Sequence, residues 1–376
     1  MNWSMKLNFS IILFYLAIVN GCSSPEPSIS IERLEQDIII LSHDSLEGRA
    51  PLTKGEEKTL AYLKARMQEI GLEPPFNGSY LQEVPLVEIT STIPNNVRFN
   101  KGGKYMDLAM SNDYTFWSPL LKPVEVLQNS ELVFAGFGID APEWGWNDFD
   151  GIDLEGKTIV VLVNDPGFHT ADSTLFNGRS MTYFGRWSYK FLEANRKGAA
   201  GCIIVHEDEA AGYPWSVVNR RTNRPEFYLN NKALRENVCG VNGWVTLEAA
   251  RELFAFCGMD YEQMRALASQ PDFKPVPMNA NYSISIINSW KESSSFNVAG
   301  LINGSERPDE VLVYTAHWDY LGIGEPVDGD SIYNGASDNA AAVAWMFSIA
   351  QTFKDMKTPP ERSILFLSPT AEEAGM

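Results

Sequence analysis

Near its C-terminal end the chain contains two apolar, strand-like runs that lead into side chains able to bind a metal ion or move a proton. The run V-L-V-Y-T precedes His317 and Asp319, and the run Ser363 to Leu367 precedes Glu372 and Glu373. Open α/β sheets place their sites beyond the carboxyl ends of the strands. The order of these segments therefore predicts an α/β domain with a site at one edge of its sheet.

The first of these segments has the geometry of a histidine and its supporting carboxylate. Side chains two positions apart on a strand share a face, so we expect His317 and Asp319 to point one way and Trp318 the other. An imidazole that binds a metal usually donates its second N–H to a carboxylate or carbonyl oxygen. We predict that His317 is a metal ligand oriented by Asp319, although a single His-x-Asp motif is more often an exposed strand end.

Two further segments supply carboxylates. Asp338 follows a Gly-Ala-Ser turn and precedes apolar residues at helical spacing in 339–354, which places it at a helix start, as a site residue or as a simple N-cap. Glu372 and Glu373 follow a run typical of a buried parallel strand, although such a pair also suits a solvated loop. One of them could bind a metal while the other takes a proton from water that the metal acidifies. The three segments together favour a metal-hydrolase site.

At these residues the chain resembles the M28 family of zinc aminopeptidases and carboxypeptidases, through an H-x-D motif, a G-A-x-D-N motif and an E-E pair. The resemblance implies a zinc-exopeptidase α/β fold with a mixed sheet flanked by helices. It also implies two zinc ions (Zn2+), one bound by His317, the other by Glu373, and both bridged by Asp338. Glu372 would be the general base and Asp319 would orient the histidine.

In that family one more acidic ligand and one more histidine follow the E-E pair, whereas three residues follow it here. Each zinc would then have two protein ligands, but a catalytic zinc normally has three and a water. His43, His169 and His206 lie far upstream and are poor substitutes. We therefore expect the sequence to be a C-terminally truncated form of a longer enzyme. Whether this part folds or is active alone stays open.

The first residues are typical of a signal peptide. An apolar stretch from Leu7 to Val19 follows Lys6, and it is shorter than the roughly 20 residues of a membrane-spanning helix. The small residues before Cys22 resemble a bacterial lipobox, which implies a signal peptide over 1–21, a lipidated Cys22 and a tether over 22–30. We expect a lipid anchor in the bacterial cell envelope, and serines after the cysteine resemble outer-membrane sorting. A cleaved signal without lipid is the alternative.

The middle of the chain predicts an inserted domain. Strand-like runs at 132–137, 158–163 and 201–205 and a helical stretch at 184–197 resemble, in order and spacing, the protease-associated (PA) domain found in many M28 peptidases. This implies a mostly-β insert over 119–278.

The segments on either side of the insert, 31–118 and 279–376, would form the peptidase domain. Helical spacing over 31–41 and again up to Gly71, with the L-E-G-R, G-E-E and G-L-E-P pattern, resembles the N-terminal helices of M28 enzymes.

The net charge narrows the choice of partners, whereas the cysteines fit an envelope compartment without adding much. A net charge of −18 without clusters of Lys and Arg argues against nucleic-acid binding. We expect Cys202, in an apolar run, to be a buried thiol, and Cys239 and Cys257 could form a disulfide.

The sequence therefore predicts a zinc-dependent exopeptidase, foremost a metallo-aminopeptidase, that acts on peptide substrates and is attached to a bacterial membrane. Carboxypeptidase action or glutaminyl cyclisation on the same scaffold are alternatives. A receptor-like homologue without catalysis is a third.

Overall fold

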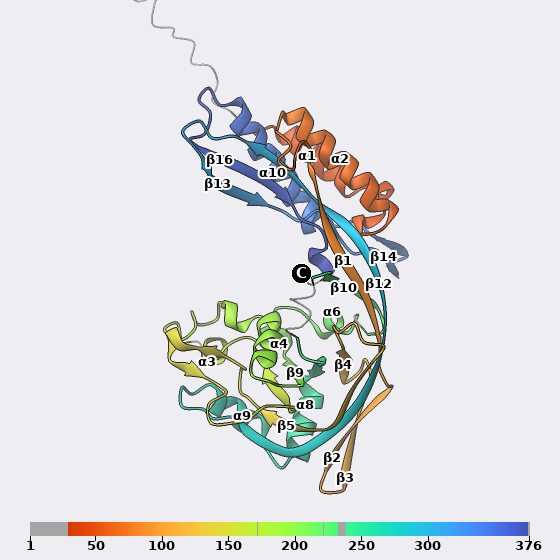
Figure 1. Cartoon of the computed structure of the whole chain (residues 1–376), viewed down its shortest axis with the longest axis vertical. Coiled ribbons are helices and arrows are strands. Elements are labelled where there is room, and N and C mark those ends of the chain that lie inside the picture. The colour runs from red at the N-terminus through yellow and green to blue at the C-terminus, as the bar shows by residue number, and fades with distance from the viewer. Residues whose placement is uncertain (1–28, 171, 221, 232–237, 375–376) are drawn as a thin grey trace, which may run out of the picture. The chain divides into compact units, whose positions relative to one another are not determined.

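The chain packs into two compact units, one made of residues up to Val84 together with Ser295–Glu373 and the other of Pro85–Ser294 (Figure 1). The computed structural model describes residues 29–170, 172–220, 222–231 and 238–374. The predicted signal peptide, Cys22 and most of the tether lie outside the described residues. Within the described ranges, none of the helices has the length and hydropathy that crossing a membrane requires. All five candidate site residues belong to the first unit.

The first unit packs helices on a mixed β-sheet (Figure 1). Its elements are α1 (Ile31–Leu41), the 3-10 helix η1 (Asp44–Arg49), α2 (Lys54–Ile70), β13 (Arg307–Thr315), β14 (Gly322–Val327), β15 (Asp330–Tyr333), the π-helical turn η4 (Ala336–Ala340), α10 (Ala341–Asp355), β16 (Arg362–Ser368) and the 3-10 turn η5 (Glu372–Ala374). Strand β16 pairs in parallel with β13 and antiparallel with the last part of β12 (Val276–Ile302). The mixed sheet expected from the sequence is thus confirmed.

Local signals in the sequence explain where the first two helices begin and end. The Ser30 side chain caps α1 by accepting a hydrogen bond from the backbone of Arg33, and Thr53 caps α2 in the same way. Helix α2 ends at Gly71, whose φ of 81° lies in the left-handed region that glycine adopts at little cost. Both predicted helices and the predicted stop at Gly71 are confirmed.

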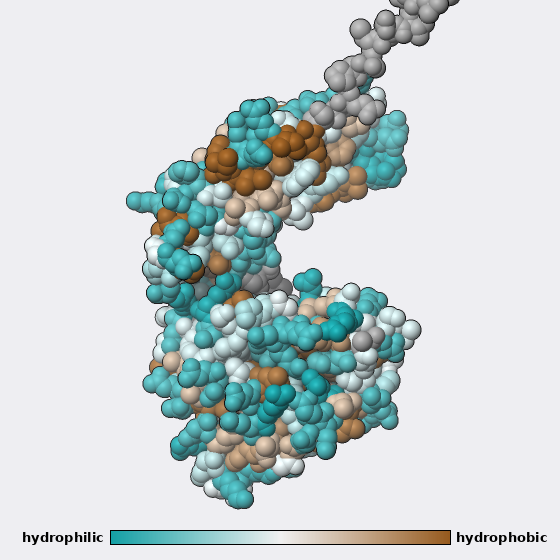
Figure 2. Space-filling view, turned by 180° about the vertical axis from the view of Figure 1, so that it is seen from behind, coloured by the Kyte–Doolittle hydropathy of each residue, from teal (hydrophilic) through white to brown (hydrophobic). Residues whose placement is uncertain are grey.

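The core of this unit lies between the sheet and the helices. Ile364 and Phe366 on β16 belong to one buried apolar cluster with Leu63 of α2 and Phe347 of α10. By contrast, the residues Val311–Val313 of β13 are each about half exposed. In the described part of the chain, β13 pairs with no strand other than β16. Figure 2 shows hydrophobic side chains gathered on one surface of this unit, whereas they are scattered over the other unit.

The second unit is built on parallel strands in the order β5, β8, β9 and β11, with β4 antiparallel at one edge. Its strands are β1 (Leu81–Thr92, from Pro85 on), β2 (Asn96–Lys101), β3 (Lys104–Ala109), β4 (Tyr114–Trp117), β5 (Val124–Phe134), β6 (Asp140–Ala141), β7 (Trp146–Asn147), β8 (Thr158–Leu162), β9 (Gly201–His206), β10 (Pro225–Leu229), β11 (Val241–Thr246) and the first part of β12. Its helices are η2 (Pro142–Trp144), α3 (Pro166–Thr170), η3 (Tyr183–Gly185), α4 (Trp187–Arg196), α5 (Asp208–Ala211), α6 (Trp215–Asn219), α8 (Leu247–Phe256) and α9 (Tyr261–Ala268). The predicted strand runs at 158–163 and 201–205 and the helix before Gly198 are confirmed, whereas the run at 132–137 is strand only as far as Phe134.

The boundaries of the second unit differ from the predicted insert at 119–278. Residues 85–118 and 279–294 pack with it because β1 pairs with β10, β2 pairs with β3 and β12, and β4 pairs with β11. Strands β1 and β12 each contribute residues to both units, so no turn or loop marks these two boundaries in the sequence.

The cysteines of this unit are free and buried. Cys202 is a buried thiol as predicted. Cys239 and Cys257 are also free, so the disulfide that the sequence left open is not formed. The Cys239 Sγ instead lies 3.3 Å from the carbonyl oxygen of Ala199.

Candidate metal centre

Four of the predicted residues bring their side chains together after the ends of β13 and β16 and before α10. The ligand atoms of His317, Glu372 and Glu373 all lie within 4.8 Å of one another. The Nε2 atom of His317 is 3.2 Å from Asp338 Oδ1 and 3.7 Å from Glu372 Oε2. Segments that are far apart in the sequence thus supply one imidazole and three carboxylates to one place.

The loop that carries His317 begins where β13 ends, at Thr315, so the motif lies just beyond the strand rather than on it. The Trp318 side chain is 1% exposed, packs in the core and donates from Nε1 to the carbonyl oxygen of Phe296 at 3.0 Å. This anchor leaves His317 facing the carboxylates. The alternation predicted for the His-x-Asp motif therefore persists in the loop.

Asp319 supports the histidine mainly through its backbone. His317 Nδ1 lies 3.1 Å from the carbonyl oxygen of Asp319 and 3.7 Å from its Oδ1. A hydrogen bond to the carbonyl leaves Nε2 free to bind a metal, because it fixes which ring nitrogen carries the proton. The predicted carboxylate–histidine contact is therefore a longer, electrostatic one.

The Asp319 carboxylate has another task that the sequence did not reveal. It is completely buried and accepts hydrogen bonds from the backbone N–H groups of Glu372 and Glu373, both at 3.1 Å. Asp319 thus joins the His317 loop to the Glu372–Glu373 turn. A hydrogen bond to a charged acceptor contributes about 1.5–3 kcal/mol, so this link fixes the turn firmly.

Asp338 is not the N-cap of the helix that follows it. Helix α10 is preceded by Ala340, without a capping side chain, and Asp338 has extended backbone angles (φ −115°, ψ 99°). Its side chain is 61% exposed and directed at His317 Nε2. The position near a helix start was predicted, and the contact favours the site interpretation over the capping one.

The spacing and charge of these groups suit a zinc ion. Two ligands of one tetrahedral zinc, each about 2.0–2.2 Å from it, lie roughly 3.3–3.6 Å apart, close to the His317 contacts. Burial lowers the pKa of His317, but the carboxylates of Asp319 and Glu372 outweigh this effect and raise the pKa to about 9. Such a surplus of negative charge around one imidazole fits a bound cation.

A buried polar chain supports the segment before the glutamates. Glu56, 5% exposed at the start of α2, accepts a hydrogen bond from Ser295 Oγ at 2.7 Å, and Ser295 Oγ lies 2.6 Å from Thr370 Oγ1. Burial raises the pKa of Glu56. The sequence showed Glu56 only as part of a G-E-E pattern, because its partners are remote along the chain.

The remaining histidines do not join the site. His43 caps η1 by accepting a hydrogen bond from Ser45 N at 3.0 Å. His206 and His169 belong to the second unit, where His206 ends β9 as a buried residue beside Asp208, at 3.0 Å, and His169 lies in α3. None of the three belongs to a metal-binding group among the described residues.

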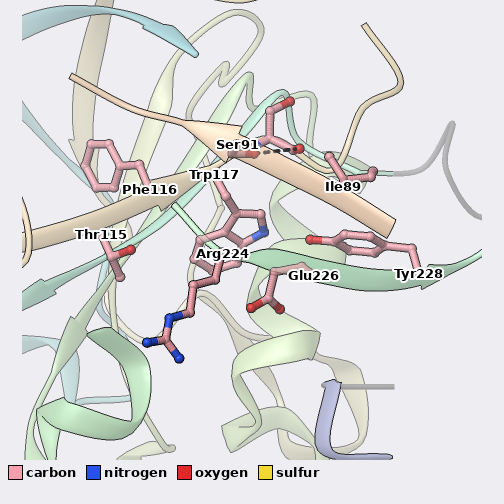
Figure 3. Close-up of a pocket in the computed structure, with 9 residues that line it drawn as sticks. Ile89, Ser91, Thr115, Phe116, Trp117, Arg224, Glu226 and Tyr228 are labelled. Atoms are coloured by element: carbon pink, nitrogen blue, oxygen red, sulfur yellow. Dashed lines mark hydrogen bonds between the residues drawn. The ribbon is translucent and has the colours of Figure 1, made fainter. Parts of the chain in front are cut away.

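A small pocket in the second unit has different chemistry. It is lined by residues of β1, β4 and β10 and their neighbours, namely Ile89, Ser91, Thr115, Phe116, Trp117, Ser118, Arg224, Glu226 and Tyr228. Figure 3 shows Arg224 and Glu226 on the same side of the Trp117 ring, and Ser91 hydrogen-bonded to a neighbouring residue. With one carboxylate and no histidine, this pocket does not offer a metal-ligand set.

One protein-family model matches the part of the chain that carries the candidate metal centre. Residues 297–376, which include all five candidate residues, match the model of Peptidase family M28. The aminopeptidase NAALADL1 of Rattus norvegicus is 30% identical over 113 residues, which are 28% of this chain and 14% of that protein. Residues 297–376 are therefore similar to the M28 family, in agreement with the resemblance found in the sequence.

Solved structures show similarity at low identity. The aminopeptidase of Aneurinibacillus sp. strain AM-1 is 16% identical, with a TM-score of 0.44, over 92% of this chain and 64% of that one. The zinc aminopeptidase BSAP of Bacillus subtilis is 18% identical, with a TM-score of 0.38, over 93% of this chain and 63% of that one. The chain thus spans less than two thirds of the length of each of these relatives.

Proposed function

We propose that this chain belongs to a zinc-dependent aminopeptidase that removes N-terminal residues from peptides. The observation that carries the proposal is the convergence of His317, Glu372 and Glu373, with ligand atoms within 4.8 Å, on a segment that matches family M28. The aminopeptidase relatives favour exopeptidase action at the N-terminus over the carboxypeptidase, cyclase and receptor alternatives.

The roles are those that the resemblance to the M28 family implies. His317 and Asp338 would hold one zinc, Glu373 would hold a second, and Asp338 would be shared between them. Bound zinc polarises a carbonyl group and lowers the pKa of water towards neutrality. Glu372, 53% exposed and 3.7 Å from His317 Nε2, can accept a proton from the attacking water and return it to the leaving amine. Asp319 holds the backbone of both glutamates during these transfers.

The test uses the protein expressed from its complete gene. Zinc content is measured by atomic absorption, and hydrolysis is measured on a peptide with a free N-terminus, the same peptide N-acetylated, and the same peptide amidated at its C-terminus. We expect bound zinc and cleavage of the free and amidated peptides alone. Cleavage of the acetylated peptide with loss of its C-terminal residue would indicate a carboxypeptidase, and zinc-free, inactive protein would refute the proposal.

A matched pair of variants separates the two glutamates. We expect Glu372→Gln to keep zinc and to lose about 10²–10⁴-fold in kcat, the usual contribution of general acid–base catalysis. We expect Glu373→Gln to lose zinc, because an amide is a poor replacement for a carboxylate ligand. Full activity in Glu372→Gln would exclude Glu372 as the base.

We also propose that the protein is a lipoprotein attached through Cys22 at the bacterial envelope, probed by radiolabelled palmitate incorporation in cells, which a Cys22→Ser variant should lose. A wild-type protein without the palmitate label would refute the anchor.

We assign the second unit, Pro85–Ser294, to a protease-associated insert because of the order of its strand runs and the helix between them.

A further inference from the structure

Arg49 is a buried cation in the first unit, close to the candidate metal centre. It ends η1 and is 1% exposed. Glu47, Gly48 and Arg49 all have φ between 52° and 67°, in the left-handed region. Such backbone costs about 1–3 kcal/mol for a residue other than glycine and persists only where surrounding structure enforces it. The guanidinium group of Arg49 is thus placed in the interior by a turn with strained backbone angles.

The donors of Arg49 are directed to backbone carbonyl groups rather than to carboxylates. Nε donates to Trp318 O at 2.9 Å, Nη1 to Asn334 O at 2.6 Å and also to Leu41 O, and Nη2 to Gly335 O at 3.0 Å. The planar fork of a guanidinium can meet several fixed acceptors at once. One side chain therefore holds the backbone of three separate segments.

Two of these segments carry the candidate ligands. Trp318 lies between His317 and Asp319, and Gly335 is the residue that precedes the turn containing Asp338. In addition, the carbonyl of Arg49 accepts a hydrogen bond from Tyr320 N at 3.2 Å. The distance between the His317 loop and the Asp338 turn is thus set by contacts to a third residue as well as by their own 3.2 Å contact.

The charge of Arg49 also suits this place. Burial lowers its pKa to about 10, opposed by the negative charges of Asp319, Asp338 and Glu373, so the guanidinium stays protonated at neutral pH. All three carboxylates belong to the candidate centre. A positive charge beneath the cluster reduces repulsion among carboxylates that must stay close before a metal binds.

We propose that Arg49 is a positioning residue of the metal centre, which sets the spacing of His317 and Asp338 by holding the carbonyl groups of Trp318, Asn334 and Gly335. This role rests on the proposed zinc function. It differs from a purely structural role in one measurable way. Loss of the fork changes zinc affinity, whereas loss of another buried arginine changes stability only.

Arg66 provides the matched control. It is 5% exposed in the same unit, and it donates to Asp37 at 2.9 and 3.1 Å and to Glu69 at 2.8 Å, which are not residues of the site. Lysine keeps the charge at either position but cannot reproduce the fork. Arg49→Lys and Arg66→Lys are therefore compared in the protein expressed from its complete gene.

Zinc affinity is measured by competition with a chromogenic chelator, and the melting temperature by circular dichroism. We expect both variants to melt below the wild type. Only Arg49→Lys should bind zinc more weakly, by roughly 10–100-fold, as for other residues that orient metal ligands. Wild-type zinc affinity in Arg49→Lys would overturn the proposal while leaving the zinc function intact, and a wild type without zinc would overturn the function itself.

A second variant decides the question if Arg49→Lys does not fold. A Cβ added at Gly335 would lie 2.4 Å from Asp338 O and 2.6 Å from Arg49 Nη2, so Gly335→Ala disturbs the Asp338 turn together with its contact to Arg49. Gly78 is the control, because its φ of 86° is also left-handed but a Cβ there meets nothing within 4 Å. Zinc binding in Gly335→Ala equal to that in Gly78→Ala overturns the positioning role, because the spacing of the Asp338 turn from Arg49 would then not affect the metal centre.

Discussion

Replacing Asp319 by asparagine keeps the shape of the side chain and removes one of its two equivalent acceptors. The carboxylate now accepts from Glu372 N and Glu373 N, both at 3.1 Å, in a completely buried position. Asparagine has one oxygen and one NH2 group, so one of the two backbone N–H groups would face a donor. Leaving a buried donor unpaired and losing a bond to a charged acceptor costs about 1.5–3 kcal/mol. We expect the unfolding free energy to fall by that amount.

The same change should reach the metal centre, because the glutamate turn is no longer held against the His317 loop. We expect zinc affinity to fall roughly 10–100-fold, measured by chelator competition, with stability measured by urea unfolding. Asp37→Asn is the control. Asp37 is 1% exposed and accepts from Arg66 and Tyr62, so its loss costs stability without touching the site. Equal zinc affinity in Asp319→Asn and Asp37→Asn would refute the role given to Asp319.

Two further predictions concern the fold. Gly48→Ala should lower the unfolding free energy by about 1–3 kcal/mol more than the open-space control Gly78→Ala, since a Cβ at Gly48 would lie 2.5 Å from Gly322 O, and equal melting temperatures would contradict this. Burial lowers the pKa of His206. As pH falls below about 6.5 the unfolded chain binds a proton that the folded chain takes up only at lower pH, so stability is lost in that window. His206→Phe should show a smaller loss between roughly pH 7 and 5.5 in urea unfolding, and an unchanged pH slope would exclude His206 as a cause.

The candidate site could be predicted because each of its residues follows a local signal. Apolar runs before His317 and before Glu372 predict strands, and strands β13 and β16 are parallel neighbours, with Val313 opposite Leu365. Parallel pairing brings their carboxyl ends together, so residues distant in sequence meet. The helix start after Asp338 follows from apolar periodicity alone.

Arg49 could not be predicted in the same way, because its partners are backbone carbonyl groups up to 286 positions away. A carbonyl is present at every residue and leaves no pattern in the sequence. The boundary of the second unit was missed for a related reason. Strands β1 and β12 run through both units without a turn, and the pairing of Leu86 with Leu229 that assigns the end of β1 has no local signature.

The residues of the candidate centre are exposed, whereas the charged residues that hold their backbone are buried. Asp338 and Glu372 have side chains 61% and 53% exposed, whereas Asp319 and Arg49 are at most 1% exposed. A buried charge costs several kcal/mol of desolvation, and replacing buried ion pairs with apolar residues of similar volume often stabilises a protein. Stability alone therefore does not account for two opposite charges beneath this surface. Their hydrogen bonds end on the backbone of the ligand-bearing segments, which accounts for the cost if those segments must stay in place while a metal binds.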